Sequence, residues 1–291
     1  REMVLDMEGS SPCSKFGINV PLNYATAYAV FGIRCIVGSD MPNNAGSLAP
    51  FKVTAPEGCI VNAQFPAPVA MRHTIGQLMP DLAFGCLAQA LPGQVPAEGA
   101  SCMYDVPMRN LPNTGVRSNA TEFAVELTHN GGTGARPTKD GLSATAYPSG
   151  VWGTQVEITE SVAPLIVHRR ELRPGSGGAG EFRGGLGQTL ELESSEGAPA
   201  AVFLSLERVK YPARGRAGGG EGACGHISFS SGEVLSGKGE FELSPGETFI
   251  MHTPGGGGFG DPKARAREAI AQDLKRGYIT EAEAAKVYGF E

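Results

Sequence analysis

Residues 173–187 read Arg173-Pro-Gly-Ser-Gly-Gly-Ala-Gly-Glu-Phe-Arg-Gly-Gly-Leu-Gly187, with seven glycines in fifteen positions. Such a stretch can cradle a phosphate or let two backbones approach closely. A Walker loop needs Gly-Lys-Ser/Thr, and no lysine occurs here. A dinucleotide fingerprint needs a following helix, whereas residues 188–193 alternate polar and apolar side chains, as a strand does. We predict a structural loop at a strand junction, packed against another segment or subunit and anchored by Arg183, with an anion nest as the less favoured alternative.

The composition is that of a globular protein rich in loops and strands. Of 291 residues, 42 are glycine and 21 are proline, and 41% of the chain is hydrophobic. The formal net charge of -6 and the lack of Lys/Arg runs disfavour nucleic acid and anionic membranes as partners. The six cysteines form no Cys-x-x-Cys pair, and no apolar run is long enough to span a membrane. We expect a soluble cytoplasmic protein with reduced thiols, no membrane and no nucleic acid.

The first hundred residues (1–100) predict a segment of mixed helix and strand. Pro21 suits the first turn of a helix, and apolar residues recur at helical spacing over residues 22–36. Residues 51–54 predict a strand. A second helical pattern over residues 75–86 is interrupted at Pro80, which kinks or restarts the helix because proline cannot donate to the preceding turn.

Residues 101–262 predict a β-rich layered domain, because the hydrophobic period changes to two. Strands are expected over residues 123–127, 156–159, 165–167, 188–193 and 201–206. Long Gly-rich connections separate them, at residues 129–134, 173–187, 214–222 and 254–261. The sequence has no fixed repeat period, so a solenoid or propeller is not supported.

The tail, residues 263–291, predicts a short helical hairpin. Asp261 is an N-cap residue followed by proline, a helix-forming run covers residues 264–275, and Gly277 closes it. Thr280-Glu-Ala-Glu283 is a capping box that opens a last helix. We expect the hairpin to pack on the body or on a partner. The predicted fold class is therefore α+β: helices in the first third, a β-rich layered body with long Gly-rich loops, and a C-terminal helical hairpin.

Few side chains are spaced as catalytic or metal-binding groups. The five histidines are dispersed and no pair has metal-ligand spacing: His73, His129, His168, His226 and His252. His129 ends a strand and enters a Gly-rich turn, where rigid scaffolds present functional groups, although a hydrogen-bonded loop histidine fits equally well. For His73, near a helix start, a structural or interface role is favoured over catalysis. Glu157 and Glu160 would face opposite sides of a regular strand, so they are not a paired acid and base.

A series of loop motifs runs in order along nearly the whole chain. They are Met41-Pro-Asn-Asn-Ala-Gly46, Pro56-Glu-Gly58, Pro66-Ala-Pro-Val69, Gly131-Gly-Thr-Gly134 with Asp140-Gly141, Glu157 with Glu160 and Pro164, residues 175–187, Glu207-Arg208 and residues 253–262. Each is weak alone, but the ordered series resembles the hydantoinase B/oxoprolinase B family. That family includes the B subunit of ATP-dependent N-methylhydantoinase, the C-terminal part of 5-oxoprolinase, caprolactamase subunits and subunits of acetone and acetophenone carboxylases.

The resemblance implies ATP-dependent activation of an inert amide or ketone. An A-type partner subunit would bind ATP with Mg²⁺ and phosphorylate the small-molecule substrate, and the B-type subunit would complete the second half-reaction, often with a divalent metal. The expected activity is ATP-dependent hydrolysis of a cyclic amide, namely a hydantoin, oxoproline or lactam. The alternatives are a subunit of an ATP-dependent ketone carboxylase and a non-catalytic scaffold chain whose Gly-rich loops build subunit interfaces.

The sequence also departs from the family pattern. B-type subunits of the family carry Thr-His-x-x-Asp and His-x-x-Asp metal motifs in their N-terminal half, and this sequence contains neither. The resemblance then implies either a split subunit, whose N-terminal half is a separate polypeptide, or a fragment. We expect the divalent metal in that half and assign no metal ligand here. The candidates for catalytic residues that face a shared cavity are His129, Glu157 and His73.

Overall fold

The structure, a computed structural model, describes residues 2–111, 122–195 and 199–290. The chain divides into two compact units, residues 1–95 and residues 96–291. The elements of the first unit are β1 (Met3–Asp6), α1 (Leu22–Ile36), α2 (Ala45–Leu48), β2 (Phe51–Thr54), α3 (His73–Gly76) and α4 (Met79–Ala90). No helix among the described residues is both long and apolar enough to cross a membrane.

The first unit packs a two-stranded parallel sheet on helices. β1 pairs with β2, and α1 contacts β2. The two long helices approach most closely at Gly32 of α1, where a Cβ would lie 2.7 Å from the Cα of Pro80. Pro80 occupies the first turn of α4. The predicted interrupted helix is thus confirmed as two helices, α3 and α4, because proline is tolerated at a helix start and not inside a helix.

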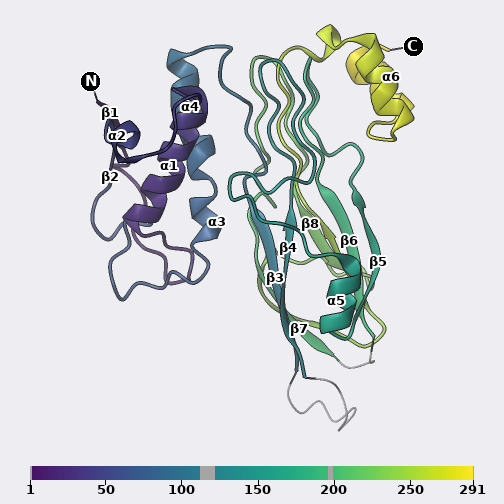
Figure 1. The fold of residues 1–291 in the computed structure, drawn as a ribbon. Helices are drawn as coiled ribbons and strands as arrows, with labels where there is room; N and C mark the ends of the chain where they lie inside the picture. The colour runs from purple at the N-terminus through teal and green to yellow at the C-terminus, as the bar shows by residue number, and fades with distance from the viewer. Residues whose placement is uncertain (1, 112–121, 196–198, 291) are drawn as a thin grey trace. The chain divides into compact units, whose positions relative to one another are not determined.

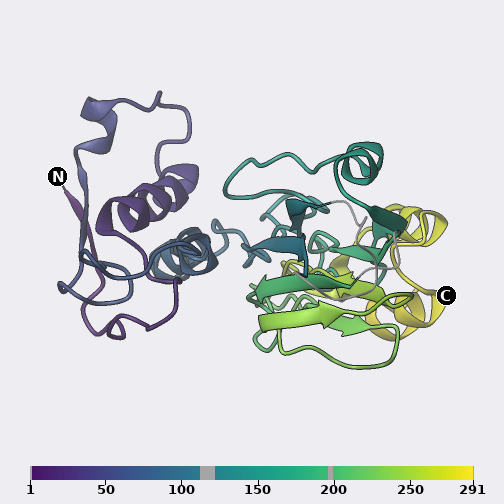
Figure 2. The same ribbon diagram turned by 90° about the horizontal axis from the view of Figure 1, so that it is seen from below.

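The second unit is a two-layer β structure. Its strands, and the helix α5 that lies between β4 and β5 in the chain, are β3 (Met103–Asn110), β4 (Ala124–Asn130), α5 (Val156–Val162), β5 (Leu165–Leu172), β6 (Gln188–Ser194), β7 (Ala200–Ser205), β8 (His226–Phe229), β9 (Lys238–Leu243) and β10 (Thr248–His252). The strands form two antiparallel sheets of four, ordered β5-β6-β10-β8 and β4-β3-β7-β9 (Figure 1). Buried side chains of both sheets make one apolar core. The predicted α+β class with a layered β body is confirmed, and Figure 2 shows the strands of this body from below.

The strand predicted over residues 156–159 is wrong, because α5 occupies these positions. Thr159 donates both its backbone N–H and its hydroxyl to the Gln155 carbonyl, at 3.0 and 3.1 Å. Glu160 accepts a hydrogen bond from the Val167 backbone N–H at 2.9 Å, which ties the helix to β5. In a segment of seven residues, alternation of polar and apolar side chains does not separate strand from helix.

At one end of the sandwich, extended segments that are rich in glycine run side by side (Figure 1). We call residues 97–100, 131–135, 176–187, 213–223 and 254–260 the glycine bundle. Backbone hydrogen bonds join its segments, such as Gly178 N–H to the Gly256 carbonyl at 2.8 Å and Gly220 N–H to the Ala179 carbonyl at 2.7 Å. At this end of the two sheets, the backbone N–H and C=O groups of the bundle segments are thus paired with one another.

Glycine is needed in the bundle because the backbones leave no room for a side chain. A Cβ on Gly132 would lie 1.9 Å from the Gly185 carbonyl oxygen, and one on Gly256 would lie 1.9 Å from the Thr133 carbonyl oxygen. Residues 173–187 enter β6 directly, so the predicted loop at a strand junction is confirmed. The segments it packs against belong to the same chain.

The C-terminal hairpin packs on the glycine bundle. It consists of η1 (Pro262–Ala264), α6 (Arg267–Lys275), α7 (Glu281–Glu283) and the π-helical turn η2 (Ala284–Tyr288). The predicted capping box of Thr280 and Glu283 is present, and Ala179 of the bundle packs against the hairpin's apolar cluster. α6 begins at Arg267, later than predicted, because Asp261 caps the short turn η1 instead.

Candidate functional site

His129 is buried where β4 meets the glycine bundle. It lies one residue before the end of β4, opposite Tyr104 of β3, and only 6% of it is exposed. Leu127 precedes it by two residues on the same strand face and belongs to the core between the sheets. The alternation of the strand thus turns His129 inward as the chain leaves the sheet.

The electrostatic surroundings keep His129 neutral. Burial, and secondarily the positive charge of Arg170, lower the pKa of its imidazole from 6.5 to about 3. Within the described part of the chain, its Nδ1 atom is buried and has no hydrogen-bond partner. A neutral imidazole has one ring nitrogen that accepts a hydrogen bond and one that donates, so it can hold a polar group that reaches it.

Arg170 comes from β5, and the segment before α5 holds its guanidinium. Nη1 donates to the Thr154 carbonyl oxygen. The guanidinium also fills the space beside Gly153, where a Cβ would lie 2.5 Å from Nη2. This positive group is therefore fixed by backbone contacts near the buried histidine.

Asn130 ties the end of β4 to the second sheet. Its carbonyl oxygen accepts from Gln188 Nε2 at 2.9 Å and from the Thr253 hydroxyl at 3.1 Å, and that hydroxyl accepts from the Gln188 N–H at 2.7 Å. Gln188 opens β6, and Thr253 follows β10. The hydrogen bonds hold three strand ends together beside His129.

A buried ion cluster joins the glycine bundle to the hairpin. Asp273 of α6 accepts from Arg183 Nε at 3.2 Å and from Arg265 Nη2 at 2.7 Å, and Arg265 pairs in bidentate fashion with Asp140, both contacts at 2.8 Å. Arg183 also donates to the Gly184 carbonyl oxygen at 2.7 Å. The predicted anchoring of the loop by Arg183 is confirmed, and Asp140, part of the series of loop motifs, is an ion-pair partner in the same cluster.

The other two candidate residues lie in different surroundings. Glu157 is in the first turn of α5, and it is exposed. His73 is the first residue of α3 in the first unit and is half-buried there. His129 and Glu157 therefore face the protein interior and solvent respectively. The assignment of all three as catalytic residues stays a prediction.

Residues 1–262 match the sequence profile of the hydantoinase B/oxoprolinase family. The chain belongs to this family. The match covers the first unit, both sheets and the glycine bundle, and it ends where the C-terminal hairpin begins. The Gly-rich loops that carry the family resemblance in sequence are thus the segments that pack together in the fold.

Several relatives of this chain have names that describe an activity. A protein of Pseudomonas sp. (strain NS671), named as the B subunit of a D-/L-hydantoinase, is 30% identical over 99% of this chain and 50% of its own length. The ATP-dependent caprolactamase of Pseudomonas jessenii has a crystal structure with a TM-score of 0.86 and 26% identity, over 99% of this chain and 51% of that chain. Acetone carboxylase is similar in fold alone, with a TM-score of 0.73 at 20% identity.

The chain thus spans about half the length of the hydantoinase and caprolactamase relatives, and about a fifth of the 5-oxoprolinases. Two relatives, the hydantoinase protein and a caprolactamase protein, are named as subunits. The described residues contain no group of three or more His, Cys, Asp or Glu side chains that could hold a metal ion. Two contacts between such side chains are a stacked pair, His226 on His252 with ring centroids 6.1 Å apart, and His168 with Glu193 at 2.8 Å.

Sequence reasoning missed two groups around the candidate site. In the sequence, Arg170 is visible only as a charged residue next to a predicted strand, and nothing singles out Arg265. Neither has a local signal, because the residues they meet, Thr154 and Asp140, are 16 and 125 positions away. The sequence signal that points to His129 as a candidate residue is a strand that ends in a Gly-rich turn.

Proposed function

We propose that this chain is part of the B-type subunit of an ATP-dependent enzyme that hydrolyses a cyclic amide, acting with an A-type partner that binds ATP. The observation that carries the proposal is the match to an ATP-dependent caprolactamase over 99% of the chain with a TM-score of 0.86. A second relative is named a hydantoinase subunit. Caprolactam and hydantoin share one feature, an amide inside a ring, which is the substrate class we propose.

ATP would serve to activate the ring amide. An amide carbonyl is a poor electrophile because its nitrogen donates electron density, and phosphorylation of the oxygen creates a better one. The glycine bundle supports placing nucleotide binding on the partner, since neighbouring carbonyls occupy the space beside its glycines, as at Gly184, where a Cβ would lie 2.0 Å from the Gly256 oxygen. A phosphate cradle needs free N–H groups, and bundle N–H groups such as that of Gly256 are bonded within the chain.

Within this chain, His129, Glu157 and His73 are the proposed catalytic candidates. His129 carries a neutral imidazole, which is the protonation state a general base needs at neutral pH. Glu157 is a carboxylate on an exposed helical turn that another chain can approach. The divalent metal is proposed to bind outside these 291 residues, in the other half of the B-type protein, and no step is assigned to it here.

Reconstitution with the candidate partner tests the proposed function. The complete B-type protein and the A-type chain are incubated with ATP and with caprolactam, 5-oxoproline or a hydantoin, and ADP release is measured. We expect ADP release that depends on one of these ring amides. ADP and carboxylated product formed only with bicarbonate and a ketone would instead assign the carboxylase alternative. Ring opening without ATP, or without any partner chain, would exclude the proposal.

Variants of the candidate residues test their roles. In the assembled enzyme, His129→Asn and Glu157→Gln are expected to lower kcat by about 100-fold or more each if the residue acts as an acid or base. His73→Asn is measured alongside them, and His168→Gln, on the exposed side of β5, is the control. Unchanged turnover in all variants, together with loss of assembly when bundle glycines are replaced, would favour the scaffold alternative.

A further inference from the structure

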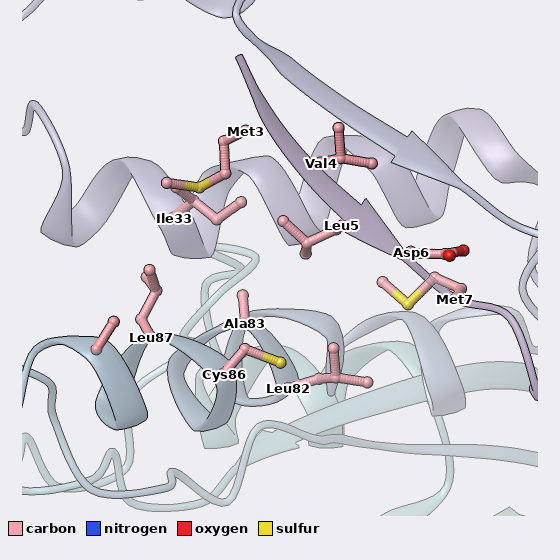
Figure 3. A pocket seen from close by; sticks show the side chains of 11 residues that line it. Met3, Val4, Leu5, Asp6, Met7, Ile33, Leu82, Ala83, Cys86 and Leu87 are labelled. Atoms are coloured by element: carbon pink, nitrogen blue, oxygen red, sulfur yellow. The ribbon is translucent and has the colours of Figure 1, made fainter. Parts of the chain in front are cut away.

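An apolar groove in the first unit lies beside the edge of β1 that pairs with no other described strand. The groove has a volume of about 280 Å³, and Leu5 and Met7 of the β1 segment, Ile33 of α1, and Leu82 and Leu87 of α4 are among its lining residues. Figure 3 shows Leu5, Ala83 and Leu87 turned into the space between β1 and the two helices. An apolar cavity of about 150 Å³ holds a benzene ring, so this groove has room for more than one apolar side chain.

The edge of β1 is open on the side away from β2. The N–H groups of Met3 and Met7 donate to Pro50 and Thr54 on the β2 side, at 2.9 and 2.8 Å. Because backbone groups alternate in direction along a strand, the N–H and C=O groups of Val4 and Asp6 point to the other edge. β1 pairs with β2 alone among the described strands. An exposed edge of this kind is a template for adding another strand.

The arrangement of the helices fits a third strand at this edge. β2 contacts α1, and β1 lies over the groove between α1 and α4 (Figure 3). A strand added beside β1 would lie over α4, where Leu82 is 41% exposed and Cys86 is also exposed. Parallel sheets occur almost only with both faces covered, and Val4 on the other face of β1 is 56% exposed. The unit therefore has the layers of an α/β structure, with a sheet of two described strands.

We infer that this groove and the open edge of β1 bind a β-strand from the polypeptide that corresponds to the other half of the B-type relatives. The family match includes β1, and the relatives have about as much chain again as the half that matches. The strand hydrogen-bonds to Val4 and Asp6 and places apolar side chains between Leu82, Cys86 and Leu87. The inference rests on family membership and geometry, and it is independent of the substrate and of ATP.

The test uses the complete B-type protein, whether its other half is continuous with this chain or co-expressed with it. Hydrogen exchange of the Val4 and Asp6 amides is measured together with the rate at which a maleimide modifies Cys86. We expect both to be at least about tenfold slower than in the same protein unfolded in denaturant. Fast exchange at Val4 and Asp6, or full reactivity of Cys86, would overturn the inference. Protection that rises with protein concentration would assign the face to a second copy and overturn it too.

Two pairs of variants separate the edge from the groove. For these variants the two halves are expressed as separate chains. Val4→Pro removes the outward N–H and leaves the bonds to β2 intact, so it should weaken co-purification of the two halves at least about tenfold, whereas Val4→Ala should not. Leu82→Lys places a charge in the groove and should have the same effect, whereas Leu48→Lys, on the exposed helix α2 outside the groove, should not. Unchanged association in both Val4→Pro and Leu82→Lys would contradict the inference. These experiments measure association of the two halves, so their outcome does not depend on whether the assembled enzyme is active.

Discussion

The glycines of the bundle are not equally required, and substitution to alanine distinguishes them. A Cβ on Gly256 would lie 1.9 Å from the Thr133 carbonyl oxygen, whereas one on Gly220 would meet its nearest atom, Ala179 N, at 3.5 Å. Gly256→Ala should therefore lower the free energy of unfolding by about 3 kcal/mol or more, since two backbones must separate. Gly220→Ala, in the same bundle, should cost less than about 1 kcal/mol.

Denaturant unfolding of the two glycine variants checks this prediction. Equal stability of both proteins would contradict the close backbone approach at Gly256. At Gly256 glycine is required because the neighbouring peptide group leaves no room for a Cβ. The sequence shows which positions are glycine but not which of them face a carbonyl, because the partner segments are far away along the chain.

His129 makes the stability of the second unit depend on pH. Its pKa is about 3 when folded against 6.5 for an exposed histidine, so the unfolded chain binds the proton more tightly. Stability should be complete above pH 6.5 and should fall as the pH drops toward 3, by up to about 1.4 kcal/mol per pH unit. His129→Gln should show a shallower loss between about pH 7 and pH 5 than the unsubstituted protein. The exposed His168→Gln should keep the steeper slope, and identical slopes in all three would refute the burial of a neutral imidazole.

At the scale of elements, the buried ion cluster holds the C-terminal hairpin on the bundle. Arg183, Arg265 and Asp273 are each 5% exposed or less. Asp273→Asn leaves two buried guanidinium groups without their shared carboxylate and should lower the unfolding free energy by about 3 kcal/mol. The matched control is Glu240→Gln, which breaks an exposed pair with Arg109 at 3.5 Å and should cost less than about 1 kcal/mol. Thermal unfolding of both variants gives the comparison, and a similar small loss in each would mean that the hairpin is held by apolar packing alone.

Asp140 adds an acid-sensitive contribution to the same cluster. Burial alone would raise the pKa of its carboxyl, but the hydrogen bonds and charge of Arg265, with help from Arg183, outweigh burial and lower it. A carboxyl with a lowered folded pKa stabilises the protein above its ordinary value of 3.8 and loses that contribution as the pH falls. The cluster is therefore expected to be intact at neutral pH.

The elements themselves are predictable where their signals are local. Pro80 at a helix start, the capping box at Thr280 and the alternation in β4 and β6 each depend on neighbouring residues, and the structure has them all. The prediction fails at α5 because Val156, Ile158 and their polar neighbours alternate like a strand over a short segment. Its helical state depends on the bonds to Gln155 and on Glu160 reaching Val167, which alternation does not reveal.

At the scale of the whole molecule, the family and the fold class can be predicted from the sequence and the packing of the loops cannot. The order of the Gly-rich motifs identifies the family, since order along the chain is visible in sequence. The glycine bundle joins segments such as residues 97–100 and 213–223, whose pairing depends on the three-dimensional fold. The burial of His129 likewise depends on both sheets. Sequence therefore indicates the candidate residue, and the structure supplies its surroundings.

We propose above all that this chain is a required part of an ATP-dependent amide hydrolase. The most direct test measures ADP and ring-opened product together in the reconstituted complex, with and without this chain. We expect about one ADP per ring opened, and neither product when the chain is omitted. Ring opening that continues without the chain, or that proceeds without ADP formation, would contradict the proposal.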